Sequence, residues 1–158
     1  MIKLTPKILF TLVCLGATLS LLAQSEKKDE KPKPKVKPIP VYLGKSDFYN
    51  GNISKHVFDS LVLQGLTAKD STGKIYKVTE FGFTYAERNL YEDSVGNQMI
   101  VADYLADFCF GDTLNAFLKI NIPQRSKPGD TVFFDRIIVK SPEGNNTLGK
   151  GIKLVLTK

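Results

Sequence analysis

Residues 131–140 constrain the fold more than any other stretch, because apolar and polar side chains alternate along them and β-branched and aromatic residues dominate. The alternation predicts a strand with two regular faces, one of which carries Val132, Phe134, Arg136, Ile138 and Lys140. The same period of two runs from Lys74 to Arg88, with an expected bend at Gly82. Shorter strands are expected at 41–43, 99–105, 106–110 and 151–157, with a break near Asp107.

Turn signals separate these strands. Four segments are rich in Gly, Pro, Asn, Asp and Ser and are expected to be turns: 50–51, 70–73, 127–130 and 141–146. Residues 89–98 are expected to form a polar loop. Short strands divided by turns favour an antiparallel sandwich over an alternating α/β fold. The sequence therefore predicts an all-β fold, a mainly antiparallel, Ig-like β-sandwich.

Two short helices interrupt the strand pattern. Apolar residues recur at helical spacing over 53–62, where Asn52 or Ser54 can cap the start and Gly65 can end the segment. A second helix is expected after Asp112 or Thr113 as the N-cap, ending at Pro123. These helices are expected to cover the ends of the sandwich.

The first 23 residues have the pattern of a secretory signal peptide. Lys3 and Lys7 precede a run of fifteen uncharged residues, Ile8 to Leu22, and a small residue follows. Cleavage is expected near Ala23 and Gln24. The apolar run is too short to cross a bilayer easily as a helix, and an uncleaved anchor is the main alternative. The chain is therefore expected to be exported, to the periplasm or cell envelope, with no transmembrane anchor after cleavage.

Residues 24–40 are expected to be a disordered Lys/Pro-rich spacer, and residues 41–158 the folded domain. The spacer holds six Lys, three acidic residues and four Pro, so it has little to bury and cannot form a regular helix. The whole chain has 22 Lys and Arg against 16 Asp and Glu, a formal net charge of +6. Residues 41–158 contribute only +1 of this, with charges of both signs interspersed. Nucleic-acid binding needs a basic face on the domain, so we do not expect this chain to bind nucleic acid.

The ionisable residues do not predict an enzyme. Cys109 is the one cysteine beyond the expected signal peptide and is expected to be a buried core residue, and His56 is the only histidine. One Cys and one His do not make a zinc set, and no nucleophile-elbow or phosphate-loop motif occurs. The carboxylate pairs Glu92/Asp93 and Asp103/Asp107 have no spacing that predicts a catalytic cleft. No catalytic residue, cofactor or metal is expected.

The order of motifs resembles a known family. An apolar strand leads to Gly51-Asn52-Ile53-Ser54-Lys55 and a helical turn, followed by a strand with Lys77-Val78-Thr79-Glu80-Phe81. A helix, Lys127-Pro128-Gly129-Asp130, the strand 132–140 and Ser141-Pro142-Glu143-Gly144 complete the series. This set, over roughly residues 38–158, resembles the C-terminal domain of the GldM/PorM gliding-motility and type IX secretion family of the Bacteroidota.

The resemblance implies a protein-binding role in the cell envelope. Full-length family members anchor in the inner membrane, and their last domain reaches a protein ring at the outer membrane. The partner is therefore expected to be an envelope protein, with self-association as a further option. Two alternatives stay open. The first is a carbohydrate-binding sandwich, with exposed aromatics as candidates: Tyr42, Tyr49, Tyr85, Tyr91 and Tyr104. The second is a TonB-like envelope adaptor, because a Lys/Pro spacer behind an apolar segment resembles TonB.

Asp followed by Ser or Thr and an apolar residue occurs several times, for example at Asp93-Ser94-Val95. The pattern resembles the O-glycosylation signal of periplasmic Bacteroidota proteins. Ser94 and Ser71, both in expected polar loops, are the candidate attachment sites. The same pairs are common in turns and helix caps, which gives them a structural interpretation as well.

Overall fold

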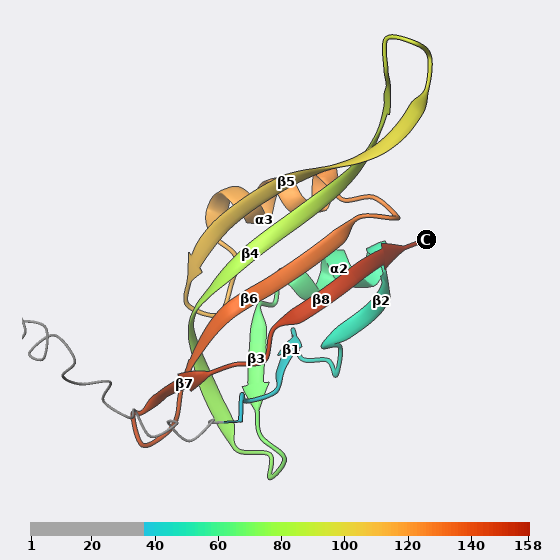
Figure 1. Ribbon diagram of the computed structural model, residues 1–158. Helices are drawn as coiled ribbons and strands as arrows, with labels where there is room; N and C mark the ends of the chain where they lie inside the picture. Colours follow the sequence, from blue (N-terminus) through green and yellow to red (C-terminus); the bar gives the residue numbers. More distant parts are fainter. Residues whose placement is uncertain (1–36) are drawn as a thin grey trace, which may run out of the picture. The chain divides into compact units, whose positions relative to one another are not determined.

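The computed structural model describes residues 37–158. Two helices and eight strands follow one another along them (Figure 1). In chain order these elements are β1 (Val41–Leu43), β2 (Asn50–Ser54), α2 (Lys55–Val62), β3 (Leu66–Lys69), β4 (Ile75–Glu92), β5 (Gln98–Phe110), α3 (Ala116–Arg125), β6 (Thr131–Lys140), β7 (Asn146–Leu148) and β8 (Ile152–Thr157).

The strands join in one curled sheet with the order β1-β3-β4-β6-β8-β2, in which β5 also pairs with β4 and β7 with β6. Most neighbours are antiparallel, but β2 and β8 run parallel. The 18-residue strand β4 is the centre of the sheet: it pairs first with β3, then with β5 on one side and β6 on the other. β5 lies at the edge of the sheet, since β4 is its only paired neighbour among the described strands.

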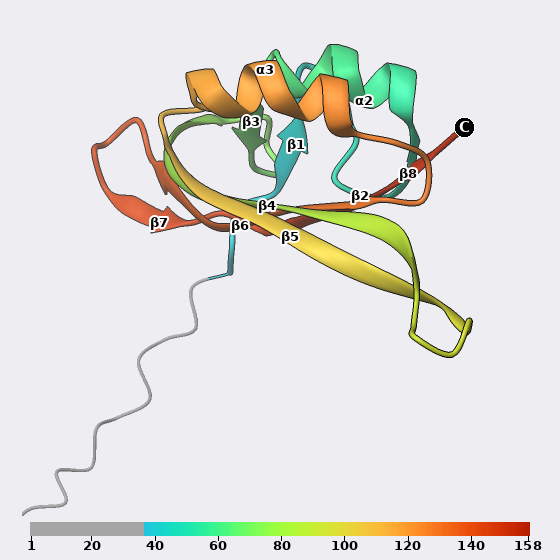
Figure 2. The ribbon, with the colours of Figure 1, turned by 90° about the horizontal axis from the view of Figure 1, so that it is seen from above.

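Both helices lie on the same face of the sheet, as Figure 2 shows, and the opposite face is left open. The core lies between this layer and the sheet. It contains aromatic and aliphatic side chains from nearly every element, among them Phe58 of α2, Leu118 and Ile122 of α3, and Phe81, Phe83 and Phe134 of the sheet. Strands β1 and β3 turn out of the main sheet toward the helices and close one side of the core (Figure 2).

Two irregularities in the β4–β6 ladder change which residues face the core. The register shifts between Val78 and Glu80 and again between Glu80 and Gly82, so each strand in turn carries one extra residue. On β6 the extra residue is Arg136, which adopts φ +46°, a left-handed conformation uncommon for a residue other than glycine. Phe134 and Ile137 are therefore both buried. The expectation of strict alternation through 131–140 is wrong beyond Phe134 for this reason.

The helices and several strand boundaries also differ in detail from the prediction. Ser54 caps α2, accepting a hydrogen bond from the Val57 amide, as one of the two expected caps. The second helix starts later than expected: Asn115 caps α3 by accepting from the Leu118 amide. Pro123 lies inside α3 rather than ending it. Half of the expected loop at 89–98 is strand, because β4 and β5 pair as far as Glu92 and Gln98 and only residues 93–97 form the turn. Strands β2, β3 and β7 were not predicted.

The expectation of a mostly β fold with two helices is confirmed. The Ig-like sandwich is not confirmed, since the described strands form one curled sheet that includes a parallel pair and is covered by helices on one face. The expected cleavage position at Ala23 and Gln24 lies outside the described residues. Ile39, which the sequence assigned to the spacer, pairs with Gly149 through a β-bridge. Within residues 37–158, no helix is both long and apolar enough to cross a membrane.

Candidate functional site

The most prominent feature of the domain is a long hairpin that extends beyond the rest of the sheet (Figures 1 and 2). β4 stops pairing with β6 at Ala86, whereas its pairing with β5 continues to Glu92. We call residues 87–103 the arm. Its tip is a turn organised by Asp93, whose carboxylate accepts from the Val95 amide at 2.9 Å and the Asn97 amide at 2.8 Å. The arm is therefore an ordered ladder rather than a loose loop.

One face of β5 is apolar from Ile100 to Phe110, and all of its side chains there are exposed except the half-buried Ala102. We call this face the apolar stripe; it consists of the side chains at alternate positions, Ile100, Ala102, Tyr104, Ala106, Phe108 and Phe110. Cys109, on the other face, is fully buried in the core, so the stripe lies on the open face of the sheet, opposite the helices. Tyr104 is 71% and Phe110 80% exposed. These two rings alone leave on the order of 300 Å² in water, which is at the lower end of the range for the largest apolar patch on a monomer.

The stripe ends in an aromatic cluster beside the bulge of β6. The rings of Phe108 and Phe110 meet edge to face, with centroids 5.6 Å apart, and the Arg136 guanidinium lies 5.8 Å from the centre of the Phe108 ring. Gly82 lies opposite Phe108 on β4 and leaves room for Asp135, since a Cβ at Gly82 would be 2.3 Å from the Asp135 carboxylate. The bulge at Arg136 thus places a cation on the open face, beside exposed aromatic rings.

The outer edge of β5 offers unpaired backbone groups. In an antiparallel ladder, alternate residues direct their N–H and C=O groups to opposite sides. The Phe108 amide bonds to the Asp107 carboxylate at 2.7 Å rather than to β4, while the Gly111 amide bonds to the Thr79 carbonyl at 2.7 Å. The residues of the apolar stripe are therefore those that point their backbone groups outward. From Ile100 to Ala106, no strand among residues 37–158 pairs with this edge.

The other face of β5 carries two exposed carboxylates. Asp103 accepts from Asn89 Nδ2 at 2.7 Å and from the Tyr91 hydroxyl at 2.9 Å, and these hydrogen bonds, that of Asn89 first, lower the pKa of Asp103. Asp107 accepts from Asn115 Nδ2 at 2.7 Å as well as from the Phe108 amide. Their hydrogen-bond partners are neutral, and neither carboxylate forms a salt bridge within the described part of the chain. Asp103 and Asp107 therefore keep their negative charge available at the edge.

The base of the arm is tied to the end of α3 by a cluster of charges. Glu87 pairs with Arg125 at 2.5 Å and with Lys127 at 3.3 Å, and Lys127 also donates to Asn89 at 2.8 Å. The hydrogen bond from Arg125, followed by that from Lys127, lowers the pKa of Glu87. These contacts fasten the base of the arm to the end of α3.

A buried carboxylate fixes the point where the arm leaves the sheet. Asp130 is fully buried and accepts from three donors: the Tyr85 hydroxyl, the Arg88 amide at 2.8 Å and the Lys127 amide at 2.9 Å. Burial, and then the hydrogen bond to Asp130, raise the pKa of Tyr85. Because buried carboxylates are costly unless several donors satisfy them, Asp130 is a structural centre that positions the arm.

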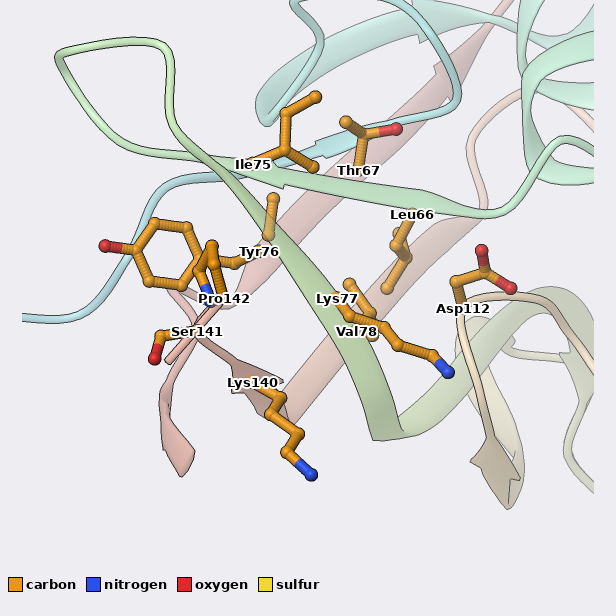
Figure 3. Close-up of a pocket in the computed structure, with 11 residues that line it drawn as sticks. Leu66, Thr67, Ile75, Tyr76, Lys77, Val78, Asp112, Lys140, Ser141 and Pro142 are labelled. Carbon is orange, nitrogen blue, oxygen red and sulfur yellow. The ribbon is translucent and has the colours of Figure 1, made fainter. Parts of the chain in front are cut away.

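A separate cavity of about 450 Å³ lies near β3 and the start of β4 (Figure 3). Its charged groups are Lys77, Lys140 and Asp112. Lys77 and Lys140 are cross-strand partners, yet in Figure 3 the Lys140 side chain points away from both Asp112 and Lys77. The walls are otherwise apolar or uncharged, with Leu66, Val78 and Pro142 among them. The three groups do not converge on a common point where a reacting atom could be held.

The residues singled out in the sequence do not assemble into one site. Ser94 is exposed at the tip of the arm and Ser71 is exposed in the turn before β4, so the two lie beyond opposite ends of that strand. His56 is exposed on α2, whereas Cys109 is buried and free, as expected for a core residue, and burial raises the pKa of its thiol. Among residues 37–158, no group of three or more His, Cys, Asp or Glu side chains could hold a metal ion.

The tyrosines considered for carbohydrate binding are also dispersed. Tyr85 is buried, and Tyr91 and Tyr104 lie on opposite faces of the β4–β5 ladder. Tyr42 and Tyr49 form one edge-to-face pair with ring centroids 6.0 Å apart beside a cavity of about 220 Å³. This pair is the one place where two of the five candidate rings meet.

Sequence reasoning missed the apolar stripe as a functional surface. Its signal is present in the sequence, since six alternate positions from Ile100 to Phe110 are apolar. The expected break near Asp107 divided one continuous strand into two, so the row of apolar positions was not recognised. The polar composition of residues 89–98 was interpreted as a loop, so the arm was not recognised. The bulge at Arg136 has no comparable signal. A comparison of the chain with known protein-family models and with curated proteins finds no match, so the candidate site stands on its geometry.

Proposed function

We propose that this chain is a non-catalytic protein-binding module of the cell envelope, exported by its N-terminal segment, and that the arm and the apolar stripe form its binding surface. The observation that carries the proposal is the apolar stripe itself. This row of mostly exposed apolar side chains lies next to a strand edge that no strand of residues 37–158 covers. Such a surface is costly for a monomer in water and typical of one that another protein covers.

The arrangement of the surface supports protein binding over catalysis. The stripe is open and extended, with aromatic rings and an arginine at one end, and aromatic residues and Arg are enriched where proteins bind one another. The charged groups around it are salt-bridged or hydrogen-bonded to neutral partners rather than gathered in a cleft. That the chain has no catalytic activity is part of the proposal.

The relation to the terminal domain of the GldM/PorM family belongs to the same proposal and rests on the order of sequence motifs. An Ig-like sandwich, predicted from the short strands and the turns between them, is the finer fold that we propose. Strands β1 and β3, which turn toward the helix side, would contribute its second layer. Location in the periplasm or cell envelope follows from the expected signal peptide and is likewise proposed.

Site-specific photo-cross-linking tests the proposal. A photoreactive phenylalanine analogue is placed at Tyr104 in the full chain, expressed in its native cell, and a matched variant carries the analogue at Ser60, which is exposed on α2. We expect one discrete protein adduct from Tyr104, identified by mass spectrometry, and none from Ser60. Adducts that form equally from both positions would contradict the proposal.

Carbohydrate binding is the competing outcome, and the Tyr42–Tyr49 pair is the observation that favours it. A glycan array separates the two functions. Glycan binding that is lost in Tyr49→Ala, together with no protein adduct from Tyr104, would replace the proposed function.

A further inference from the structure

The geometry points to one mode of binding: we propose that β5 accepts an extended segment of another protein as an added antiparallel strand, and that this segment alternates apolar and basic residues. The inference rests on the proposed function and deepens it by naming the kind of partner. It is carried by three observations that coincide on β5: an edge that no strand of residues 37–158 pairs with, an apolar face, and two exposed carboxylates, Asp103 and Asp107, on the other face.

The unpaired edge supplies the backbone contacts. Ile100, Ala102, Tyr104 and Ala106 direct their N–H and C=O groups away from β4, whereas the next outward amide, that of Phe108, is already bonded to Asp107. The available ladder is therefore about seven residues long. Strand addition to an exposed edge takes its affinity from such main-chain hydrogen bonds.

The two faces of β5 supply the specificity. Side chains of an added strand alternate between the faces of the sheet, so every second residue would extend the apolar stripe beside Ile100, Ala102, Tyr104 and Ala106. The residues between them would lie beside Asp103 and Asp107, which are four residues, about 13 Å, apart. Neither carboxylate forms a salt bridge within residues 37–158, and the nearest cations to Asp103, Arg125 and Lys127, are already paired with Glu87. Basic residues on that face of the added strand would complement them.

The same charges disfavour a second copy of this chain as the added strand. Two copies of β5 paired about a two-fold axis place each residue opposite a residue of the same face. For any axis between residues 102 and 106, Asp103 or Asp107 then lies directly or diagonally opposite a carboxylate of the other copy. Like charges in such positions are destabilising. Axes nearer the turn between β4 and β5 avoid the repulsion between carboxylates but shorten the ladder. A basic strand from another protein therefore fits the edge better than a second copy of β5.

A synthetic peptide tests the inference directly on the full chain. The probe is the acetylated, amidated heptapeptide KVKVKVK carrying a fluorescent label, and its matched control is EVEVEVE. We expect the lysine peptide to bind with an affinity that falls as salt is added, and the glutamate peptide to bind at least tenfold more weakly. Replacing both acids, Asp103→Asn with Asp107→Asn, is expected to weaken binding of the lysine peptide about fivefold. Asp47→Asn, an exposed acid in the loop before β2, is the control and leaves binding unchanged.

Backbone methylation of the peptide tests the strand geometry without altering the protein. In an antiparallel ladder, the valine amides would face β5 and the lysine amides would face water. N-methylation of the valines is therefore expected to weaken binding at least tenfold, and N-methylation of the lysines to leave it within about twofold. Bound peptide is also expected to slow hydrogen exchange at the amides of Ile100, Ala102 and Tyr104.

The outcomes separate this inference from the proposed function. Equal binding of the lysine and glutamate peptides, or equal loss from both methylation patterns, overturns strand addition by a basic segment. Suppose that, without peptide, protection of the β5 amides from exchange increases with protein concentration. This result would assign the edge to a second copy of the chain and would also overturn strand addition by a basic segment. If any of these results is found while the Tyr104 photo-adduct persists, the protein-binding function stands and only its mode is wrong.

Discussion

Removal of the buried carboxylate at the base of the arm has an effect whose size follows from the contacts. In Asp130→Ala, the partly buried Arg88 and Lys127 amides lose their acceptor, whereas the Tyr85 hydroxyl can still donate to the Arg125 carbonyl, 3.2 Å away. Leaving a buried donor unsatisfied costs about 1–3 kcal/mol. Because both amides are only partly buried, the low end of this range applies to each, and we expect the free energy of unfolding to fall by about 2–3 kcal/mol, a large share of the total for a domain of this size.

Two further variants divide this loss among the donors. Asp130→Asn keeps one acceptor oxygen, so its loss is expected to be about half as large. Tyr85→Phe removes one donor and leaves the carboxylate bonded to both amides, so a loss of about 1 kcal/mol is expected. Urea denaturation followed by circular dichroism measures all three, and an unchanged slope indicates that the unfolded state is unaffected.

The same variants test whether Asp130 positions the arm. Because the Arg88 amide lies where β4 leaves the sheet, Asp130→Ala is expected to speed hydrogen exchange at residues 87–90 more than at β8. A free energy of unfolding within about 1 kcal/mol of that of the unaltered chain, with unchanged exchange in the arm, would refute the structural role assigned to Asp130.

Four other predictions concern charge, backbone conformation, thiol reactivity and modification. Pairing with Arg125 lowers the folded-state pKa of Glu87, so the stabilisation from Glu87 is present above the unfolded pKa near 4.5 and is lost as the pH falls. In Glu87→Gln, the free energy of unfolding should therefore decrease less steeply on acidification. An unaltered decrease contradicts this prediction. Arg136→Asn should be tolerated, whereas Arg136→Val should cost about 1–3 kcal/mol in denaturant unfolding, because β-branched residues disfavour a positive φ; equal costs would exclude backbone strain. The Cys109 thiol should react with a thiol reagent only after unfolding, and rapid labelling of the folded chain would show that it is not buried. If Ser94 carries a glycan, the intact mass of native material should exceed the sequence mass and Ser94→Ala should remove the excess; an unmodified mass excludes it.

The sequence predicted the elements whose residues face a core on one side. Strand β6 and helix α2 are examples, since a period of two and a helical spacing are directly visible in them. The faces of β6 could not be predicted beyond Phe134, because the bulge at Arg136 arises from pairing with β4 rather than from local preference. The start of α3 depends likewise on a tertiary contact: the Asp112 carbonyl accepts from the Leu66 amide, which holds this segment outside the helix.

The candidate site was harder to predict than the fold because it lacks the usual signals. Asp107 suggested a break in the strand, since Asp is rare in strands, yet it pairs with Phe83 within the ladder and bonds to Asn115. The arm buries little apolar surface and is held by cross-strand pairing, so its composition resembles that of a loop. An alternating apolar pattern looks the same in a sequence whether its side chains are buried or exposed. The structure is needed to show that these side chains are exposed.

Hydrogen exchange along β5 is the most direct test of the central claim that this strand is the binding surface. The measurement compares the free chain with the chain recovered with its cross-linked or co-purified partner. We predict that the amides of Ile100, Ala102 and Tyr104 exchange rapidly in the free chain and slowly in the complex. The amides of Val101 and Asp103, which already face β4, should change little. Unchanged exchange along β5, with new protection confined to the region of Tyr42 and Tyr49, would contradict the account.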